Sequence, residues 1–144
     1  VWTVPAERHK TGAITGKPLK RPIIKPTEEL IKYVISMNNG SSMLFTKEGS
    51  RDPVGRSSLQ SLPYNLMQYS WRRLGYQFPH WSLHDLRRTA RTNFSDLTEP
   101  HIAEIMLGHK LPGIWQVYDK SDYLEEQCKA YQAWWERVES IVKT

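Results

Sequence analysis

Apolar residues recur every three or four positions through the middle of this chain, and that spacing predicts amphipathic helices. The first such stretch is 26–40, where Thr27 is the expected N-cap and an Asn-Asn-Gly turn ends the helix. The second stretch is 59–74, and a glycine follows it. Pro63 lies inside this second stretch, so the helix either starts near Pro63 or is kinked there.

The N-terminal end has a different pattern, with β-branched and aromatic residues in short runs. Val1–Val4 and Arg21–Ile24 are expected to pair as a β-hairpin, with turns at Gly12 and Gly16 in the connection. Met43–Phe45 is one more strand-like run. The whole pattern predicts a mainly α chain with a small N-terminal β-hairpin or sheet, which is an α+β fold.

Two further helices are predicted in the second half of the chain. Ser82 is the expected N-cap of the first helix, and Asp85, three positions on, completes a capping box. Thr98, with Pro100 in the first turn, starts the next helix. Gly108 suits the left-handed C-cap that ends it.

A final apolar stripe covers 122–142, with Asp122 as its expected cap and a heavy load of aromatic residues. The stripe belongs to an acidic region, because residues 99–144 contain eight acids and five lysines or arginines. Residues 1–25, in contrast, contain six basic residues and one acid. We therefore expect a basic surface on the first two-thirds of the chain. We also expect the acidic aromatic tail to dock on its own domain or on a neighbouring subunit.

Length and composition limit the classes of protein to which the chain can belong. The 144 residues suit one domain, and 39% hydrophobic residues with six Trp and seven Tyr indicate a folded chain. A net charge of +5 permits an anionic partner such as nucleic acid. The single cysteine, Cys128, excludes an internal disulfide and suits a reducing cytosol. No apolar run has the length of a membrane span, and no signal peptide is recognisable.

The predicted helix at Ser82 opens with side chains that suit an anion. His84 and Arg87 are three positions apart, so they share one face of the first turns, where backbone N–H groups already favour negative charge. His109 follows the glycine stop and can add a second imidazole to the same phosphate. Each residue alone is more often structural, and the scattered His and Cys residues form no zinc pattern. Together they predict a phosphate site without a metal.

Three motifs in a fixed order resemble the catalytic domain of the tyrosine recombinase (phage integrase) family. They are His84-x-x-Arg87, then Gly108-His109, then Tyr118 nine positions after that histidine. The segments HDLRRTARTN and IMLGHKLPGIWQVYD are most similar to the integrases of P4-type prophages and genomic islands. The segment WTVPAERHKTG is similar to the family's β-hairpin, so the resemblance covers essentially the whole chain.

The resemblance implies a catalytic role for each matching residue. Tyr118 is the nucleophile that attacks a DNA phosphodiester, leaving a 3′-phosphotyrosyl bond and a free 5′-hydroxyl. Arg87 stabilises the extra charge of the transition state, His84 accepts or relays the tyrosine proton, and His109 hydrogen-bonds the phosphate. Lys10 protonates the leaving 5′-oxygen. Because the covalent ester conserves the energy of the broken bond, rejoining requires no ATP, metal or other cofactor.

Two of these assignments have competitors. Lys17 and Lys20 compete with Lys10 as the acid, because the length of the hairpin varies within the family. Tyr123 lies five residues beyond the expected nucleophile but lacks the family spacing from the histidine. The resemblance also implies contacts with the DNA backbone. The residues expected to make them are Lys17, Lys20, Arg88, Arg91 and Lys110. For Arg88 and Arg91 a structural contact is the alternative.

The implied function is site-specific recombination at double-stranded DNA attachment sites, which integrates and excises a prophage or genomic island. The resemblance implies a homotetramer on DNA in the bacterial cytoplasm, at the nucleoid and not at a membrane. Residues 1–144 match the C-terminal catalytic domain, and the chain opens on Val1 within a strand-like run, so we expect a fragment. The family's first catalytic arginine precedes the hairpin, so we expect this chain alone to be inactive or poorly active. The alternatives are a type IB topoisomerase-like nicking-closing enzyme and a non-catalytic DNA-binding prophage remnant.

Overall fold

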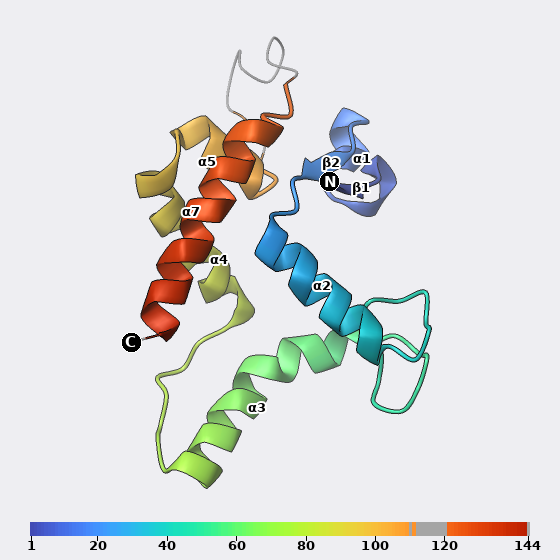
Figure 1. Ribbon diagram of the computed structural model, residues 1–144, viewed down its shortest axis with the longest axis vertical. Helices are drawn as coiled ribbons and strands as arrows, with labels where there is room; N and C mark the ends of the chain where they lie inside the picture. Colours follow the sequence, from blue (N-terminus) through green and yellow to red (C-terminus); the bar gives the residue numbers. More distant parts are fainter. Residues whose placement is uncertain (110, 112–120, 144) are drawn as a thin grey trace. The chain divides into compact units, whose positions relative to one another are not determined.

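The computed structural model describes residues 1–109, 111 and 121–143. The chain forms two compact units: the hairpin unit combines Val1–Thr27 with Thr89–Thr144, and the middle unit is Glu28–Arg88. Both units are mainly helical, and Figure 1 follows the chain through them by colour. The expected mainly α chain with a small β-hairpin is confirmed, whereas the recombinase fold stays a prediction.

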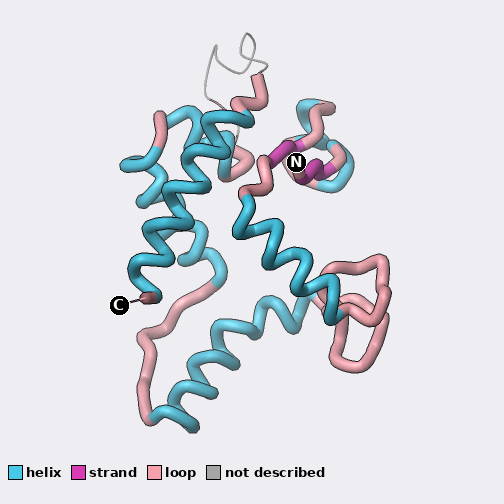
Figure 2. The backbone as a smooth tube through the Cα atoms, viewed as in Figure 1, coloured by secondary structure: helices cyan, strands magenta, loops and turns pink. Residues whose placement is uncertain are grey.

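The sheet of the hairpin unit consists of two short antiparallel strands. They are β1 (Trp2–Val4) and β2 (Leu19–Arg21), and the first residue of β1 faces the last residue of β2. The sequence pattern predicted the second strand at Arg21–Ile24, so the observed strand lies two residues earlier. Pro22 explains the difference, because proline has no N–H with which to continue the ladder. Figure 2 shows both strands in magenta.

The connection between the strands is folded. It contains the short helical segments η1 (Ala6–Arg8) and α1 (Gly12–Thr15), where the pattern predicted only turns. His9 joins these segments, because its Nδ1 accepts the N–H of Gly12 at 3.0 Å and its Nε2 donates to the carbonyl of Lys17 at 3.1 Å. Gly12 is required here, since a Cβ would lie 2.2 Å from a backbone carbonyl oxygen of η1.

Three helices contribute to the hairpin unit: α4 (Leu83–Leu97), α5 (Pro100–Met106) and α7 (Leu124–Val142). The first turns of α4 belong to the middle unit. The helices α5 and α7 pack against each other, as Figure 1 shows. The ring of Phe94 on α4 makes edge-to-face contacts with two aromatic rings of α7. The buried apolar cluster of the unit comprises Phe94, Ile102, Ala103, Met106 and Ala130.

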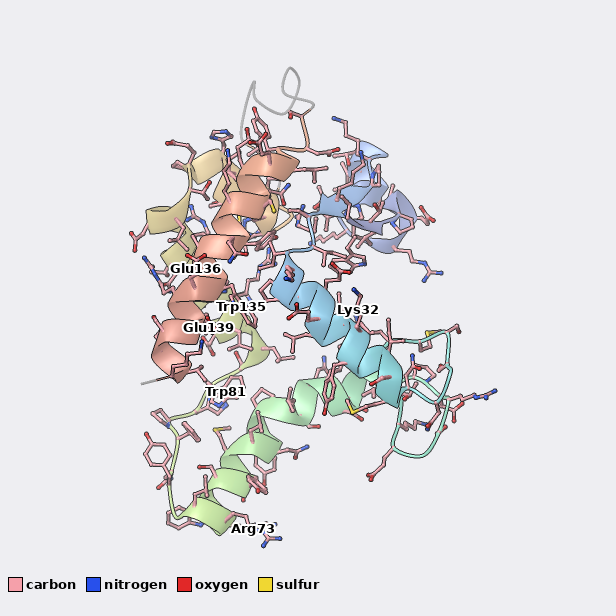
Figure 3. The ribbon with its side chains drawn as sticks, viewed as in Figure 1. Lys32, Arg73, Trp81, Trp135, Glu136 and Glu139 are labelled. Atoms are coloured by element: carbon pink, nitrogen blue, oxygen red, sulfur yellow. The ribbon has the colours of Figure 1, made fainter. Side chains whose placement is uncertain are left out.

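The acidic aromatic tail docks on its own unit through α7. Ala130 on this helix is 1% exposed within the apolar cluster. Trp135, Glu136 and Glu139 of the same helix are labelled in Figure 3, and the two glutamates contribute to the acidic charge of the C-terminal region. Of the two docking modes expected from the sequence, the structure therefore shows the one within the chain.

Two helices of the hairpin unit start at residues other than the predicted caps. The N–H of Thr98 donates to a carbonyl of α4, so Thr98 closes the end of that helix, and Glu99 occupies the N-cap of α5. The prediction that Asp122 caps the last helix is also wrong, because Tyr123 is the N-cap of α7. The carboxylate of Asp122 instead forms an ion pair with Lys20 at 2.7 Å.

The middle unit contains most of α2 (Lys25–Met37) and all of α3 (Arg56–Leu74). The predicted cap Thr27 is wrong, because α2 begins two residues earlier and Thr27 lies in its first turn. A proline is tolerated in that first turn, since its missing N–H has no helical partner there. Pro63 does not start α3 but lies inside it.

The loop between α2 and α3 is held by polar contacts. Met43–Phe45, predicted as a strand, forms bends, and the loop contains an isolated bridge between Thr46 and Pro53. Asn38 explains this difference, because its buried side-chain amide donates to the carbonyls of two loop residues. Those side chain-to-backbone bonds compete with strand pairing.

Some of the exposed side chains of the middle unit are charged. Lys32 on α2 and Arg73 on α3, both labelled in Figure 3, are exposed, and Lys32 Nζ lies 2.5 Å from a carboxylate oxygen of Glu28. Across the described part of the chain, no helix combines the length and the apolar character needed to cross a membrane.

Candidate functional site

The corner that carries His109 is a helix C-terminus closed by a glycine. The N–H of Gly108 donates to the carbonyl of Ile105 at 2.8 Å, and the N–H of His109 donates to the carbonyl of Glu104 at 3.0 Å. These two bonds form a Schellman motif, and Gly108 has the left-handed φ of 73° that this motif needs. The prediction of a glycine C-cap followed directly by His109 is confirmed.

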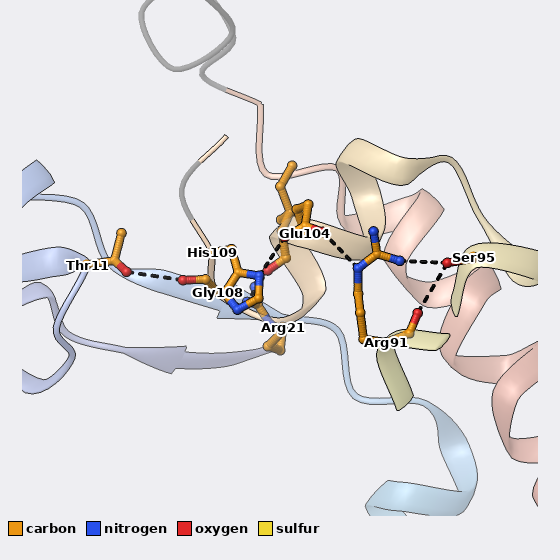
Figure 4. Close-up of polar contacts among 8 residues, drawn as sticks. Thr11, Arg21, Arg91, Ser95, Glu104, Gly108 and His109 are labelled. Atoms are coloured by element: carbon orange, nitrogen blue, oxygen red, sulfur yellow. Dashed lines mark hydrogen bonds and ion pairs between the residues drawn. The ribbon is translucent and has the colours of Figure 1, made fainter. Parts of the chain in front are cut away.

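The imidazole of His109 is held by a carboxylate. Its Nδ1 lies 2.5 Å from Oε2 of Glu104, and the other carboxylate oxygen accepts from Nε of Arg91 at 2.7 Å. Arg91 is itself fixed, because its Nη1 donates to Oγ of Ser95 at 2.7 Å. Figure 4 shows this row of contacts from α4 to the end of α5. Arg91, expected to contact DNA or to be structural, has a structural contact here.

The charge state of Glu104 determines which role the facing ring nitrogen of His109 has in their hydrogen bond. Partial burial alone would raise the pKa of Glu104, but hydrogen bonds and charge from His109 and Arg91 outweigh burial, so its pKa lies below the ordinary value. Glu104 is therefore a carboxylate at neutral pH and can only accept hydrogen bonds. Nδ1 of His109 must accordingly carry a hydrogen.

The hairpin is bonded to the same corner. The guanidinium of Arg21, which is 8% exposed, donates from Nε to the carbonyl of Met106 at 3.2 Å and from Nη2 to the carbonyl of Ile105. The hydroxyl of Thr11 donates to the carbonyl of Gly108 at 3.1 Å, as Figure 4 shows. The carbonyls that end α5 are thus satisfied by hairpin side chains, which fixes the hairpin to the His109 corner.

A pocket of about 350 Å³ lies between the hairpin and this corner. The polar residues that line it include His9, Lys17, Lys20, His109 and Gln127. The side-chain carbonyl oxygen of Gln127 is buried and has no hydrogen-bond partner among the described residues. The pocket is therefore lined by several basic side chains and by the carboxylate of Asp122.

The three candidate lysines of the hairpin have different surroundings. Lys17 and Lys20 line the pocket beside His109, and Lys20 is paired with Asp122. Lys10 is exposed, does not line the pocket, and forms no hydrogen bond or ion pair with the described residues. The choice among these lysines therefore stays open. Tyr118 and Lys110, predicted as nucleophile and DNA contact, lie outside the described residues.

His84 and Arg87 belong to the middle unit, at the start of α4. Both side chains are exposed, and their spacing of three positions puts them on one face of the helix. The helix start is fixed by Asp85, whose carboxylate accepts from the N–H of Ser82 at 2.9 Å and from its hydroxyl at 2.7 Å. These bonds from Ser82 lower the pKa of Asp85, and Arg88, 3.5 Å away, adds to the effect. The predicted contact between Ser82 and Asp85 is confirmed.

The predicted site residues therefore fall into two groups. The hairpin unit brings His109 together with Lys17, Lys20 and Arg91, but not with Lys10. The middle unit holds His84 with Arg87 and Arg88. Glu104 and Arg21 were not predicted to take part. Arg21 has partners 84 and 85 positions away, which no local pattern can indicate. For Glu104, the only indication in the sequence is its position at the end of the helix that precedes His109.

Within the described ranges, no group of three or more His, Cys, Asp or Glu residues is arranged to hold a metal ion. Comparisons of the chain with models of protein families, with curated proteins and with solved structures give no match. The site must therefore be interpreted from its own residues.

Proposed function

We propose that this chain is the catalytic domain of a site-specific recombinase that cleaves and rejoins double-stranded DNA through a 3′-phosphotyrosine intermediate. The observation that carries the proposal is the ordered set of His84-x-x-Arg87, Gly108-His109 and Tyr118, with nine positions from the second histidine to the tyrosine. This order and spacing resemble the tyrosine recombinase family. In that family the corresponding residues act together on one DNA phosphate.

Features of the hairpin unit support the proposal. The backbone at His109 is fixed by the Schellman motif, and the hairpin is bonded to the same corner through Arg21 and Thr11. The hairpin also contributes basic side chains to the pocket beside His109. A fixed imidazole next to basic groups suits a phosphate, because preorganised donors need little rearrangement when charge develops.

The proposed cleavage step uses five residues of this chain. The phenolic oxygen of Tyr118 attacks the DNA phosphorus, and the bond from phosphorus to the 5′-oxygen breaks. The tyrosine proton passes to His84, and the leaving 5′-oxygen takes a proton from Lys10. Arg87 neutralises charge on the non-bridging oxygens, and His109 donates a hydrogen bond to one of them. Rejoining reverses these steps, so the cycle consumes no cofactor.

The wider function follows from the same resemblance. We propose that the protein acts as a homotetramer on two DNA attachment sites in the bacterial cytoplasm, where it integrates and excises a prophage or genomic island. Basic residues of the hairpin contribute to DNA affinity through phosphate contacts, which depend on salt and carry little sequence information.

The proposal is tested by trapping the covalent intermediate. A library of nicked duplexes of random sequence lets the short strand beyond the cleavage site diffuse away, so that a protein–DNA adduct accumulates and its site can be sequenced. We expect an adduct with the longest natural chain that contains these residues, and a weaker one or none with residues 1–144 alone. Tyr118→Phe should abolish the adduct, and the matched control Tyr123→Phe should retain it. If the longest natural chain forms no adduct, or if an adduct survives Tyr118→Phe, the proposal is refuted.

The products distinguish the alternatives. Recombinant molecules formed from two duplexes support the recombinase. Relaxation of supercoiled DNA without recombinants supports a topoisomerase-like enzyme, and DNA binding without any adduct supports a non-catalytic remnant.

The identity of the general acid is tested with a leaving group that needs no proton. When sulfur replaces the bridging 5′-oxygen of the substrate, the leaving strand departs as a thiolate and needs no proton. Loss of the acid should therefore change the cleavage rate little. We expect Lys10→Ala to slow cleavage of the oxygen substrate and to be rescued by the sulfur substrate. Lys17→Ala and Lys20→Ala are the matched controls, and rescue of either one in place of Lys10→Ala moves the role to that lysine.

A further inference from the structure

We propose that Glu104 is a positioning residue that sets the tautomer and the orientation of His109. This role rests on the recombinase function proposed above, in which His109 hydrogen-bonds the DNA phosphate. Glu104 lies in the last turn of α5, five positions before His109, and the left-handed Gly108 separates them. The helix end turns the histidine back onto the carboxylate.

Glu104 holds His109 at two points. Its backbone carbonyl accepts the N–H of His109 at 3.0 Å, and its Oε2 lies 2.5 Å from Nδ1 of the ring. One residue therefore fixes both the backbone and the side chain of the histidine. With Nδ1 held in this way, the rotation of the ring is fixed and Nε2 lies on the opposite edge.

The carboxylate is itself fixed on its other side. Oε1 of Glu104 accepts from Nε of Arg91 at 2.7 Å, and Nη1 of Arg91 donates to Oγ of Ser95 at 2.7 Å. The side chains of Glu104 and Arg91 are 27% and 34% exposed, so both are partly withdrawn from water. Each carboxylate oxygen has its own charged or ring donor, which leaves Glu104 little freedom to rotate away from His109.

The consequence for the chemistry concerns the second ring nitrogen. A carboxylate has no hydrogen to donate, so Nδ1 must carry one, and the neutral ring then has its lone pair on Nε2. When the ring takes a second proton, the carboxylate provides the counter-charge and Nε2–H can donate to a phosphate oxygen. Glu104 thus directs Nε2, not Nδ1, to the reacting phosphate.

A purely structural role predicts different results. Ion pairs that are still partly exposed to water contribute little to stability, so a structural Glu104 would change the stability slightly and leave the ring chemistry unchanged. A positioning role must instead alter the tautomer of His109 and must act on the reaction only through that ring. The tautomer ratio of His109 and the rate of the reaction can be measured independently of each other.

The first experiment measures the tautomer in the free chain, without DNA. Nitrogen-15 shifts of His109, recorded at a pH where the ring is neutral, should show the Nδ1–H form as dominant in the wild type. Glu104→Gln should lower the ratio of the Nδ1–H to the Nε2–H form about tenfold, because one amide oxygen must serve two donors and the charge is lost.

The matched control Glu99→Gln, at the exposed N-cap of the same helix, should leave the ratio unchanged. A dominant Nε2–H form in the wild type, or an unchanged ratio in a folded Glu104→Gln chain, refutes the role. If Glu104→Gln fails to fold, the wild-type spectrum alone decides.

The second experiment is a double-mutant cycle on covalent adduct formation in the longest natural chain. Glu104→Gln should slow the reaction about 10- to 100-fold, the usual range for residues that orient an active group. In a His109→Ala background the same change should have almost no further effect, whereas additive losses refute the positioning role. If the wild type forms no adduct, the recombinase function fails, and the tautomer measurement still decides how Glu104 acts on His109.

Discussion

The two units of the chain bury different kinds of residue. The hairpin unit has a contiguous apolar cluster in which Ala103 is fully buried and Ile102 is 2% exposed. The middle unit is described throughout, and its buried residues are Asn38, Pro63 and Ser70. Apolar side chains of its helices are exposed, for example Leu74 at 72% and Tyr33 at 62%. The same helical pattern in the sequence therefore corresponds to two different kinds of packing.

This difference shows where the geometry of the site comes from. In the hairpin unit, α5 is fixed by the apolar cluster on one side and by Arg21 on its last carbonyls, so the backbone that carries His109 has little freedom. In the middle unit, the start of α4 that carries His84 and Arg87 is fixed by the polar contact between Ser82 and Asp85. Regions with few buried apolar contacts open more readily than packed ones. We therefore expect the corner that carries His109 to be more rigid than the start of α4.

The difference between the two units is tested most strongly by removing a side chain from the apolar cluster of the hairpin unit. Ile102→Ala should lower the free energy of unfolding by about 2–5 kcal/mol, because it leaves a cavity in a packed core. The matched control is Leu74→Ala on α3, which should change the stability by no more than about 0.5 kcal/mol because the side chain is exposed. Urea unfolding followed by circular dichroism measures both. Equal losses would show that the middle unit depends on apolar packing as much as the hairpin unit does.

A smaller effect is expected from the buried arginine that joins the hairpin to α5. Arg21→Ala removes one donor from each of the carbonyls of Ile105 and Met106 and leaves only the weaker or shared contacts there, so the stability should fall by about 1–3 kcal/mol. Hydrogen exchange at the amides of Gly108 and His109 should speed up in the same variant. Arg8→Ala, an exposed arginine of η1, is the control and should change neither quantity. Unchanged exchange in Arg21→Ala would show that the corner is rigid without the hairpin.

The smallest effect concerns the acid dependence of stability. The folded pKa of Glu104 lies below its ordinary value, because the contacts with His109 and Arg91 outweigh the opposing effect of partial burial. Folding therefore favours the carboxylate, and this contribution is complete above the unfolded pKa and is lost as the pH falls through the folded pKa. Glu104→Gln should reduce the loss of stability on acidification by less than about 1 kcal/mol. Unfolding curves between neutral and acid pH test this, with Glu99→Gln as the control that keeps the wild-type slope.

The helical elements were largely predictable, whereas their first residues, apart from that of α4 after Ser82, were not. The period of apolar positions indicated α2, α3, α4, α5 and α7, because burial of one helix face repeats locally along the chain. The caps Thr27, Thr98 and Asp122 were wrong. For Asp122 the reason is a competing partner, since its carboxylate pairs with a lysine of the distant hairpin. Gly108 was correct because a left-handed C-cap depends on the backbone of a single residue.

The sequence by itself determined the helical pattern, the glycine stop before His109, and the order of residues on which the proposed chemistry rests. Only the tertiary structure decided that Glu104, itself held by Arg91, contacts the ring of His109, and that Arg21 bonds the hairpin to the end of α5. The physical reason is the range of the interactions. Periodicity and caps act over a few residues, whereas the contacts that orient His109 and fix the hairpin depend on side chains that only folding brings together.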